Sequence, residues 1–251
     1  MGEIAAHAGV LLAAALTAAL TLFSGFGLGT LLFPVFRVAA GASLPAAVAA
    51  TAVVHLANNL FKVAHFAREA RRPVILRFGL PAIAASVAGA LLLESMDAGA
   101  PLREWSAGGR SFAITPLGLA MGGLFVLFAA LEVAPAARDL AFPERMLPLG
   151  GLLSGFLGGI SGHQGALRAA FLARAGLTAA GFIGTSAVIA SMVDVARLSV
   201  YGLKGGAAIP WSLVGAGILG AFLGVRGAAG FVRGGKVSPA TSPSRRSCGS
   251  G

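Results

Sequence analysis

The chain has 251 residues, of which 57% are hydrophobic and 11% are charged. This composition excludes a soluble domain with a separate core and predicts an all-α integral membrane protein of about seven membrane segments. The formal net charge of +10 comes from basic residues in loops and in the tail, so it indicates membrane topology and not binding to nucleic acid. Uncharged stretches that span or nearly span a bilayer cover residues 4–36, 38–61, 112–131, 146–167, 175–193 and 205–225.

The first apolar stretch is interrupted by a glycine-rich run, Ser24-Gly25-Phe26-Gly27-Leu28-Gly29. Such a run predicts a broken helix, and the unpaired N–H groups at the start of the following half-helix attract anions. Glycine is needed at this point because a side chain would hold the ligand away from the backbone. The candidate anion-binding residues of this first break are Gly25, Gly27, Gly29 and Thr30.

The next apolar stretch, residues 38–61, carries polar residues at a spacing of three to four, which places them on one face of a helix. Ionisable groups at membrane depth are costly and usually functional, so we expect this face to line or gate a transport path. Two alternatives stay open: Lys62 can extend to the cytoplasmic headgroups, and the other polar residues can hold helices together. The candidate residues are Thr51, His55, Asn58, Asn59 and Lys62.

Loop charges predict the orientation of the chain. Residues 65–77 carry four arginines against one acid and are expected in the cytoplasm, whereas the balanced connection 95–111 is expected outside. The basic C-terminal residues also favour the cytoplasm. By this parity, residues 146–174 form a re-entrant hairpin from the cytoplasmic side, and residues 8–36 form one from the opposite side. Straight passage of both stretches, giving seven plain spans, is the alternative.

The second break is the run Ser161-Gly162-His163-Gln164-Gly165, followed by Arg168. Gln164 can donate to an anion, and Arg168 can add charge with bidentate geometry. We therefore expect a substrate site in this hairpin, although Arg168 can also serve as a surface anchor. The candidate residues here are Gly162, His163, Gln164, Gly165 and Arg168.

Polar residues recur on the last part of the chain at an offset of about 135 from the first set. Thr51 corresponds to Ser186, and Asn59 corresponds to Asp194. We therefore predict two inverted repeats, residues 1–135 and a shortened repeat 136–235, with a disordered tail 236–251. The second set of candidate path or gate residues is Thr185, Ser186, Asp194 and Arg197. For Asp194 and Arg197, the alternative is an internal ion pair.

The first break, Gly25-Phe26-Gly27-Leu28-Gly29-Thr30-Leu31-Leu32-Phe33-Pro34, resembles the G-I-G-G-G-L-L-L-V-P signature of the TauE/SafE family of sulfite-exporter-like proteins. The second break is similar to a variant of that signature, and the resemblance covers roughly residues 8–231. It implies export of small sulfur-containing anions, such as sulfite or organosulfonates, across a prokaryotic cytoplasmic membrane. Gln164, Ala166 and Phe171 depart from the signature, and the last segment of the family pattern, after residue 231, has no counterpart.

The function expected from these patterns is secondary transport of a small anion by alternating access between the two hairpins. Arg168 and Gln164 would select the anion. The expected partners are the anion and the lipid bilayer, and a homo-oligomer is also compatible with the sequence. A passive channel or a cation transporter with Asp194 as ligand is the main alternative; a scaffold or an enzyme is disfavoured. No cofactor or metal is expected, because the histidines are scattered over different segments.

Overall fold

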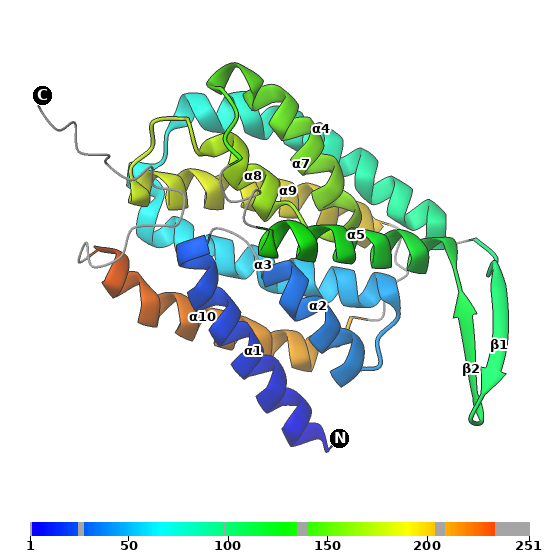
Figure 1. The fold of residues 1–251 in the computed structure, drawn as a ribbon. Coiled ribbons are helices and arrows are strands. Elements are labelled where there is room, and N and C mark those ends of the chain that lie inside the picture. Colours follow the sequence, from blue (N-terminus) through cyan, green and yellow to red (C-terminus); the bar gives the residue numbers. More distant parts are fainter. Residues whose placement is uncertain (1, 25–27, 98, 135–139, 204–208, 234–251) are drawn as a thin grey trace, which may run out of the picture.

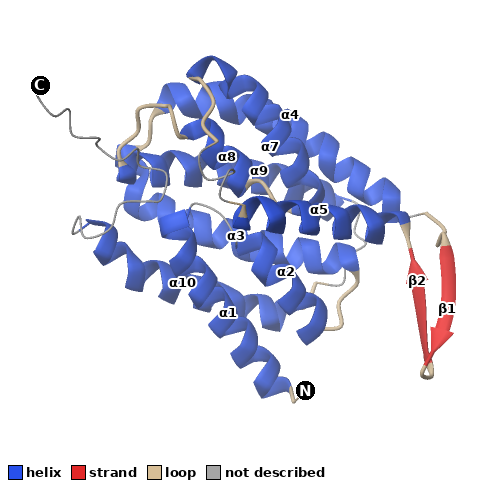
Figure 2. Cartoon of the chain, in the orientation of Figure 1, coloured by secondary structure: helices blue, strands red, loops and turns tan. Residues whose placement is uncertain are grey.

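The computed structural model of the chain describes residues 2–24, 28–97, 99–134, 140–203 and 209–233. These residues form a bundle of helices with one small hairpin of strands at its edge (Figures 1 and 2). The elements are α1 (Glu3–Ser24), α2 (Leu28–Ala39), α3 (Leu44–Phe66), η1 (Ala67–Glu69), α4 (Arg72–Asp97), β1 (Arg103–Ala107), β2 (Arg110–Ile114), α5 (Pro116–Val133), η2 (Glu144–Met146), α7 (Leu147–Ser161), α8 (Gly165–Leu172), α9 (Ala179–Leu203) and α10 (Trp211–Arg233). The predicted tail, 236–251, lies outside the described residues.

The all-α membrane class predicted from composition is confirmed. In the described ranges, α1, α3, α4, α9 and α10 are long and apolar enough to cross a membrane, and α5 contains a shorter apolar segment, Pro116–Ala130. One face of α1 is exposed and the other is buried: Leu12, Leu16 and Leu20 are exposed, whereas Ala14 and Ala18 are fully buried. A helix with a leucine face outward and small residues inward is suited to lipid on one side and close helix packing on the other.

Helix boundaries follow local signals in the sequence. The side chain of Ser43 accepts a hydrogen bond from the N–H of Ala46 at the start of α3, and Thr115 caps α5 in the same way. Residues 112–114 were expected within a membrane segment, but they belong to β2, and α5 begins only at Pro116. Proline is favoured in the first turn of a helix, so Thr115 and Pro116 fix this later start.

Glycines on α7 and α10 allow two pairs of helices to approach closely. An added Cβ on the α7 glycines would clash with backbone carbonyls of α4, and one on the α10 glycines would clash with carbonyls of α1. Contacts advance in the same direction along both helices of each pair, so α7 runs parallel to α4 and α10 runs parallel to α1. The glycines are Gly151, Gly155 and Gly159 on α7, and Gly220 and Gly224 on α10.

The central pair, α3 and α9, is antiparallel. Asp194 on α9 contacts His55 and Asn59 on α3, while Gly184, nearer the start of α9, packs on Phe66 at the end of α3. Asn59 and Asp194 are equivalent positions of the two proposed repeats, so an internal two-fold axis would pass close to their contact. The exchanged pairing of α1 with α10 and of α4 with α7 agrees with inverted repeats, which stay a prediction.

The second predicted break falls between helices, because residues 162–164 separate α7 from α8. Residues 25–27 of the first break lie outside the described residues, between the end of α1 and the start of α2. The helices on either side of the two breaks differ in length. The arms of the first hairpin have 22 and 12 residues, and those of the second have 15 and 8. A helix of 22 residues is about 33 Å long, so α1 alone matches the hydrocarbon core, whereas α7 does not.

Candidate functional site

The helices α2 and α7, each next to one of the glycine runs, meet inside the bundle. A Cβ added to Gly29 would lie 3.2 Å from the carbonyl oxygen of Gly162, so the start of α2 touches the end of α7. At this junction lies a cavity in which the centres of water molecules can occupy about 30 Å³. This is room for two or three waters or one small ion. Its lining is Thr21, Leu28, Gly29, His55, Asn58, Asn59, Lys62, Phe128, Gly162, His163, Gly165, Ala166, Arg168, Phe182, Ile183, Ser186 and Ala187.

Two basic side chains line this cavity, and both are buried. Arg168 is 3% exposed and donates from Nε to the hydroxyl of Ser186 at 2.8 Å. Lys62 is 6% exposed and donates from Nζ to the hydroxyl of Thr21 at 2.7 Å. Lys62 therefore does not extend to the headgroups, and Arg168 is not a surface anchor. Among the described residues, no carboxylate lines the cavity, so its wall carries positive charge.

Several polar atoms of the cavity wall have no partner among the described residues. They are both amide atoms of Asn58, both ring nitrogens of His163 and Nη1 of Arg168. The His163 ring packs edge-on against Phe125 at 4.4 Å and stacks on Phe128 at 5.5 Å, which holds it in place. A buried polar group without a partner costs about 1–3 kcal/mol, so the wall is arranged to bind something polar.

Helix ends add to the positive character of the wall. Gly165 and Ala166, the first two residues of α8, line the cavity, and no side chain caps this helix. Leu28 and Gly29, the first two described residues of α2, line it from the other hairpin. The N–H groups of a first helical turn lack partners within the helix and carry the positive end of its dipole. An anion in the cavity would therefore lie close to the N-termini of both half-helices.

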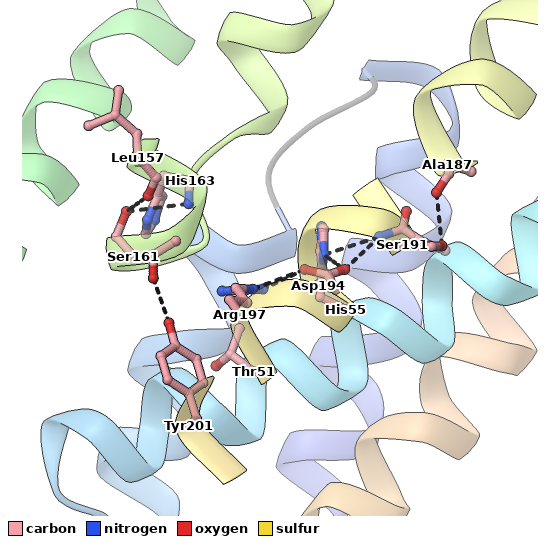
Figure 3. A network of polar contacts seen from close by, with 12 residues as sticks. Thr51, His55, Leu157, Ser161, His163, Ala187, Ser191, Asp194, Arg197 and Tyr201 are labelled. Carbon is pink, nitrogen blue, oxygen red and sulfur yellow. Dashed lines mark hydrogen bonds and ion pairs between the residues drawn. The ribbon is translucent and has the colours of Figure 1, made fainter. Parts of the chain in front are cut away.

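A buried ionic network adjoins the cavity (Figure 3). Arg197 donates to Oδ1 of Asp194 from Nε at 3.1 Å and from Nη2 at 2.7 Å. Nδ1 of His55 lies 2.6 Å from Oδ2 of the same carboxylate, and the amide of Asn59 donates to that oxygen at 3.3 Å. His55 and Asn59 line the cavity, whereas Asp194 and Arg197 stand behind them. The alternative of an internal ion pair for Asp194 and Arg197 is thus what the structure contains.

Arg197 also connects this network to the second break. A Cβ added to Gly162 would fall 2.8 Å from Nη1 of Arg197, and Gly162 has a φ of +79°, which a side chain would strain. One turn further along α9, the hydroxyl of Tyr201 donates to the carbonyl of Gly159 on α7 at 2.6 Å. The polar face of α9 therefore contacts both α3 and the end of α7.

Some predicted site residues lie elsewhere. The Thr51 hydroxyl donates to the carbonyl of Ala47 in its own helix, and Thr185 accepts from the N–H of Arg71. The Gln164 side chain is fully buried against Gly158 and is not part of the cavity lining. Gly25 and Gly27 lie outside the described residues, as does the side chain of Thr30.

Seven lining residues were not predicted from the sequence: Thr21, Leu28, Phe128, Ala166, Phe182, Ile183 and Ala187. Two of them contact predicted site side chains. Thr21 binds Lys62 from α1, and Phe128 packs on His163 from α5. Thr17 and Thr21 stand one helical turn apart within the apolar stretch of α1 that follows His7, which was a usable signal for a polar inner face of α1. Phe128 had no such signal, because the segment Pro116–Ala130 of α5 is apolar on all sides.

The fold and this cavity define a multi-pass membrane protein with a buried, positively charged site between its two pairs of short-connected helices. The family model described as Sulfite exporter TauE/SafE matches residues 10–241. The chain therefore belongs to the sulfite exporter TauE/SafE family, a family of anion exporters, as its glycine runs indicated. Comparison with curated proteins and with solved structures gives no match.

Proposed function

We propose that this protein is a secondary transporter that exports a small sulfur-containing anion, such as sulfite or an organosulfonate, across a prokaryotic cytoplasmic membrane. The observation that carries this proposal is the buried cavity beside the starts of α2 and α8, which Lys62 and Arg168 line and to which the described part of the chain contributes no carboxylate. Arg197 behind the wall adds a third positive charge, and Asp194 subtracts one. The formal charge of these four groups is 3 − 1 = +2. An anion offsets this charge, and its oxygens can accept from the unpartnered donors of the wall.

Transport would proceed by alternating access, with the cavity opening to one side and then to the other. The hairpins approach the cavity through Gly29 and Gly162, so small movements at the two breaks change the walls of the site. The loop charges support a cytoplasmic C-terminus. Without an anion, hydrogen bonds to Thr21 and Ser186 hold the side chains of Lys62 and Arg168 in place. A bound anion would accept part of the hydrogen bonding of these two side chains.

A cation transporter with Asp194 as ligand is less well supported. Both oxygens of this carboxylate accept hydrogen bonds, from Arg197 on one side and from His55 and Asn59 on the other. Within the described part of the chain, no three His, Cys, Asp or Glu residues lie together as ligands for a metal ion would. An entering cation would also meet the positive charges of Lys62 and Arg168.

Flux into or out of proteoliposomes tests the proposal, with sulfite and sulfoacetate as substrates. We expect Arg168→Gln to reduce anion flux at least about tenfold, because a hydrogen bond to a charged group contributes about 1.5–3 kcal/mol. Arg226→Gln removes the same charge from an exposed position on α10 and should leave flux near the native level. Equal flux in the native protein and both variants, or flux of cations alone, would contradict the proposal.

A further inference from the structure

We propose that His55 binds a proton together with the transported anion, so that the two ligands bind cooperatively. This inference rests on the proposed function of the cavity as an anion site. It concerns the nitrogen of the His55 ring that the buried ionic network leaves free.

The contacts of Asp194 assign the hydrogen to one His55 nitrogen. Asp194 accepts two hydrogen bonds from Arg197, as an ionised carboxylate does, so we assign Nδ1 of His55 as the donor in their 2.6 Å contact. Nδ2 of Asn59 lies 3.1 Å from the same Nδ1, and in this tautomer it donates to Oδ2 of Asp194. In the neutral ring, Nε2 then has a free lone pair. The ring lines the cavity, and Nδ1 is turned to Asp194, so Nε2 is the atom able to take a proton from the cavity side.

The charges around His55 make this proton depend on the anion. From α9 it faces Asp194 and Arg197, which balance each other through two hydrogen bonds. From the second hairpin it faces Arg168 and His163, and Lys62 stands on its own helix two turns away, in the same cavity wall. A proton on His55 would therefore add positive charge beside Lys62 and Arg168 while the cavity holds no anion.

An anion in the cavity reverses this balance. It offsets the charges of Lys62 and Arg168, so protonation of His55 then adds an attractive interaction. Linkage requires the effect to be reciprocal: if the anion favours the proton on His55, the proton strengthens binding of the anion by the same factor. The pair Asp194 and Asn59 would hold the ring in the orientation that presents Nε2 to the cavity in both protonation states.

Binding measurements on the purified full chain test this coupling. Thiosulfate and ethanesulfonate serve as probes, since their own charge is constant around neutral pH. Titration calorimetry in buffers of different ionisation enthalpy reports the protons taken up on binding. We expect uptake approaching one proton per anion, and an affinity that falls up to about tenfold per pH unit on the alkaline side. His55→Gln should bind without proton uptake, and His7→Gln, near the start of α1 and outside the cavity lining, should behave as the native protein does.

The outcomes separate the two proposals. Absence of anion binding by the native protein would overturn the anion site itself. Binding without proton uptake, or uptake that persists in His55→Gln, would overturn only the role of His55. If His55→Gln does not fold, nitrogen NMR of labelled histidines in the native protein decides the matter: the Nε2 signal of His55 must shift toward the protonated form on adding ethanesulfonate, and an unchanged signal refutes the coupling.

A second inference concerns the hairpin β1–β2, which stands clear of the bundle and turns aside from the line of α5 (Figure 1). We infer that this hairpin lies in the lipid headgroup layer. Its depth is fixed by its neighbours, because only Thr115 separates β2 from α5, and α4 ends at Asp97. A segment so close to the ends of two membrane helices lies at the level of the membrane surface.

The two faces of the hairpin differ in chemistry. Cross-strand pairing places Arg103 opposite Ile114 and Trp105 opposite Phe112, and these four positions share one face because side chains alternate along a strand. The rings of Trp105 and Phe112 stack with centroids 5.4 Å apart and remain 44% and 42% exposed. The opposite face carries Glu104, Ser106, Ser111 and Ala113. Tryptophan and arginine beside apolar groups suit the boundary between headgroups and acyl chains.

Tryptophan fluorescence tests this placement, since the chain has 2 tryptophans and Trp211→Phe leaves Trp105 alone. The variant is placed in vesicles of phosphatidylcholine and phosphatidylglycerol with brominated acyl chains. We expect bromine near the headgroup to quench Trp105 more than bromine near the chain end, and aqueous iodide to quench it weakly. Strong iodide quenching without bromine quenching would place the hairpin in water. Protection from both quenchers would place it against protein, such as a second copy, and either result overturns the inference.

Discussion

The Asp194→Asn substitution probes the buried ion pair most directly. Asp194 is fully buried, and Arg197 is 1% exposed, so the substitution leaves a guanidinium charge inside the bundle without its carboxylate. Removing one partner of a buried ion pair typically costs about 3–5 kcal/mol, because the remaining charge is neither paired nor hydrated. For a chain of this size each kcal/mol corresponds to about 2–4 °C, so we expect a fall in the unfolding temperature of about 6–20 °C.

Thermal unfolding of the purified protein in detergent, followed by intrinsic fluorescence, is the appropriate assay. Glu144→Gln is the matched control, because Glu144 pairs with Arg71 at 3.6 Å while both side chains are more than 40% exposed. An exposed pair contributes about 0–1 kcal/mol, so the control should shift the unfolding temperature by a few degrees at most.

The double variant Asp194→Asn, Arg197→Gln separates charge burial from simple loss of contacts. It leaves no unpaired charge, so it should recover part of the stability that Asp194→Asn alone loses. The reasoning is refuted if Asp194→Asn and Glu144→Gln lower the unfolding temperature by equal, small amounts. It is also refuted if the unfolding temperature of the double variant is no higher than that of Asp194→Asn alone.

Three further predictions concern helix packing and the cavity. Gly155→Ala places a methyl group against the backbone of α4 and should destabilise the fold by about 1–3 kcal/mol in thermal unfolding, whereas Gly122→Ala, which meets open space on α5, should not. Lys62→Met should raise the half-saturating anion concentration in proteoliposome flux at least about tenfold, and an unchanged value would exclude Lys62 as a ligand. Tyr201→Phe removes the donor to the Gly159 carbonyl and should cost about 1 kcal/mol of stability; a neutral effect would show that this bond contributes nothing.

The helices could be predicted from the sequence, because a membrane requires long apolar segments with recognisable patterns. Glycine runs located both breaks, and polar residues at helical spacing identified the inner faces of α3 and α9. The hairpin β1–β2 was missed, since its second strand is uncharged from Phe112 onward and reads as the beginning of the following apolar helix. Only the cap at Thr115 and Pro116 marks the true boundary.

The site was harder to predict than the fold. Periodicity shows which residues share a face, but it does not show which helix that face meets. His55 and Asp194 are 139 residues apart, and their contact depends on how α3 crosses α9. Gln164 was expected at the anion because it follows the second break, yet the backbone turn at Gly162 directs its side chain toward Gly158. A side chain in a turn has no periodic signal, so its direction follows from tertiary packing.

The exchanged helix pairs restrict which parts of the molecule can move. α1 belongs to the first half of the chain but packs on α10 of the second half. Likewise, α7 belongs to the second half but packs on α4 of the first half. Glycines bring the backbones of both pairs together. The two halves are therefore interlocked and cannot swing apart as independent blocks without opening both contacts. We expect the motion to be carried by the short returning helices α2 and α8, with the long helices acting as a common frame, so a crosslink between α4 and α7 should leave transport intact while one between α2 and α8 should stop it.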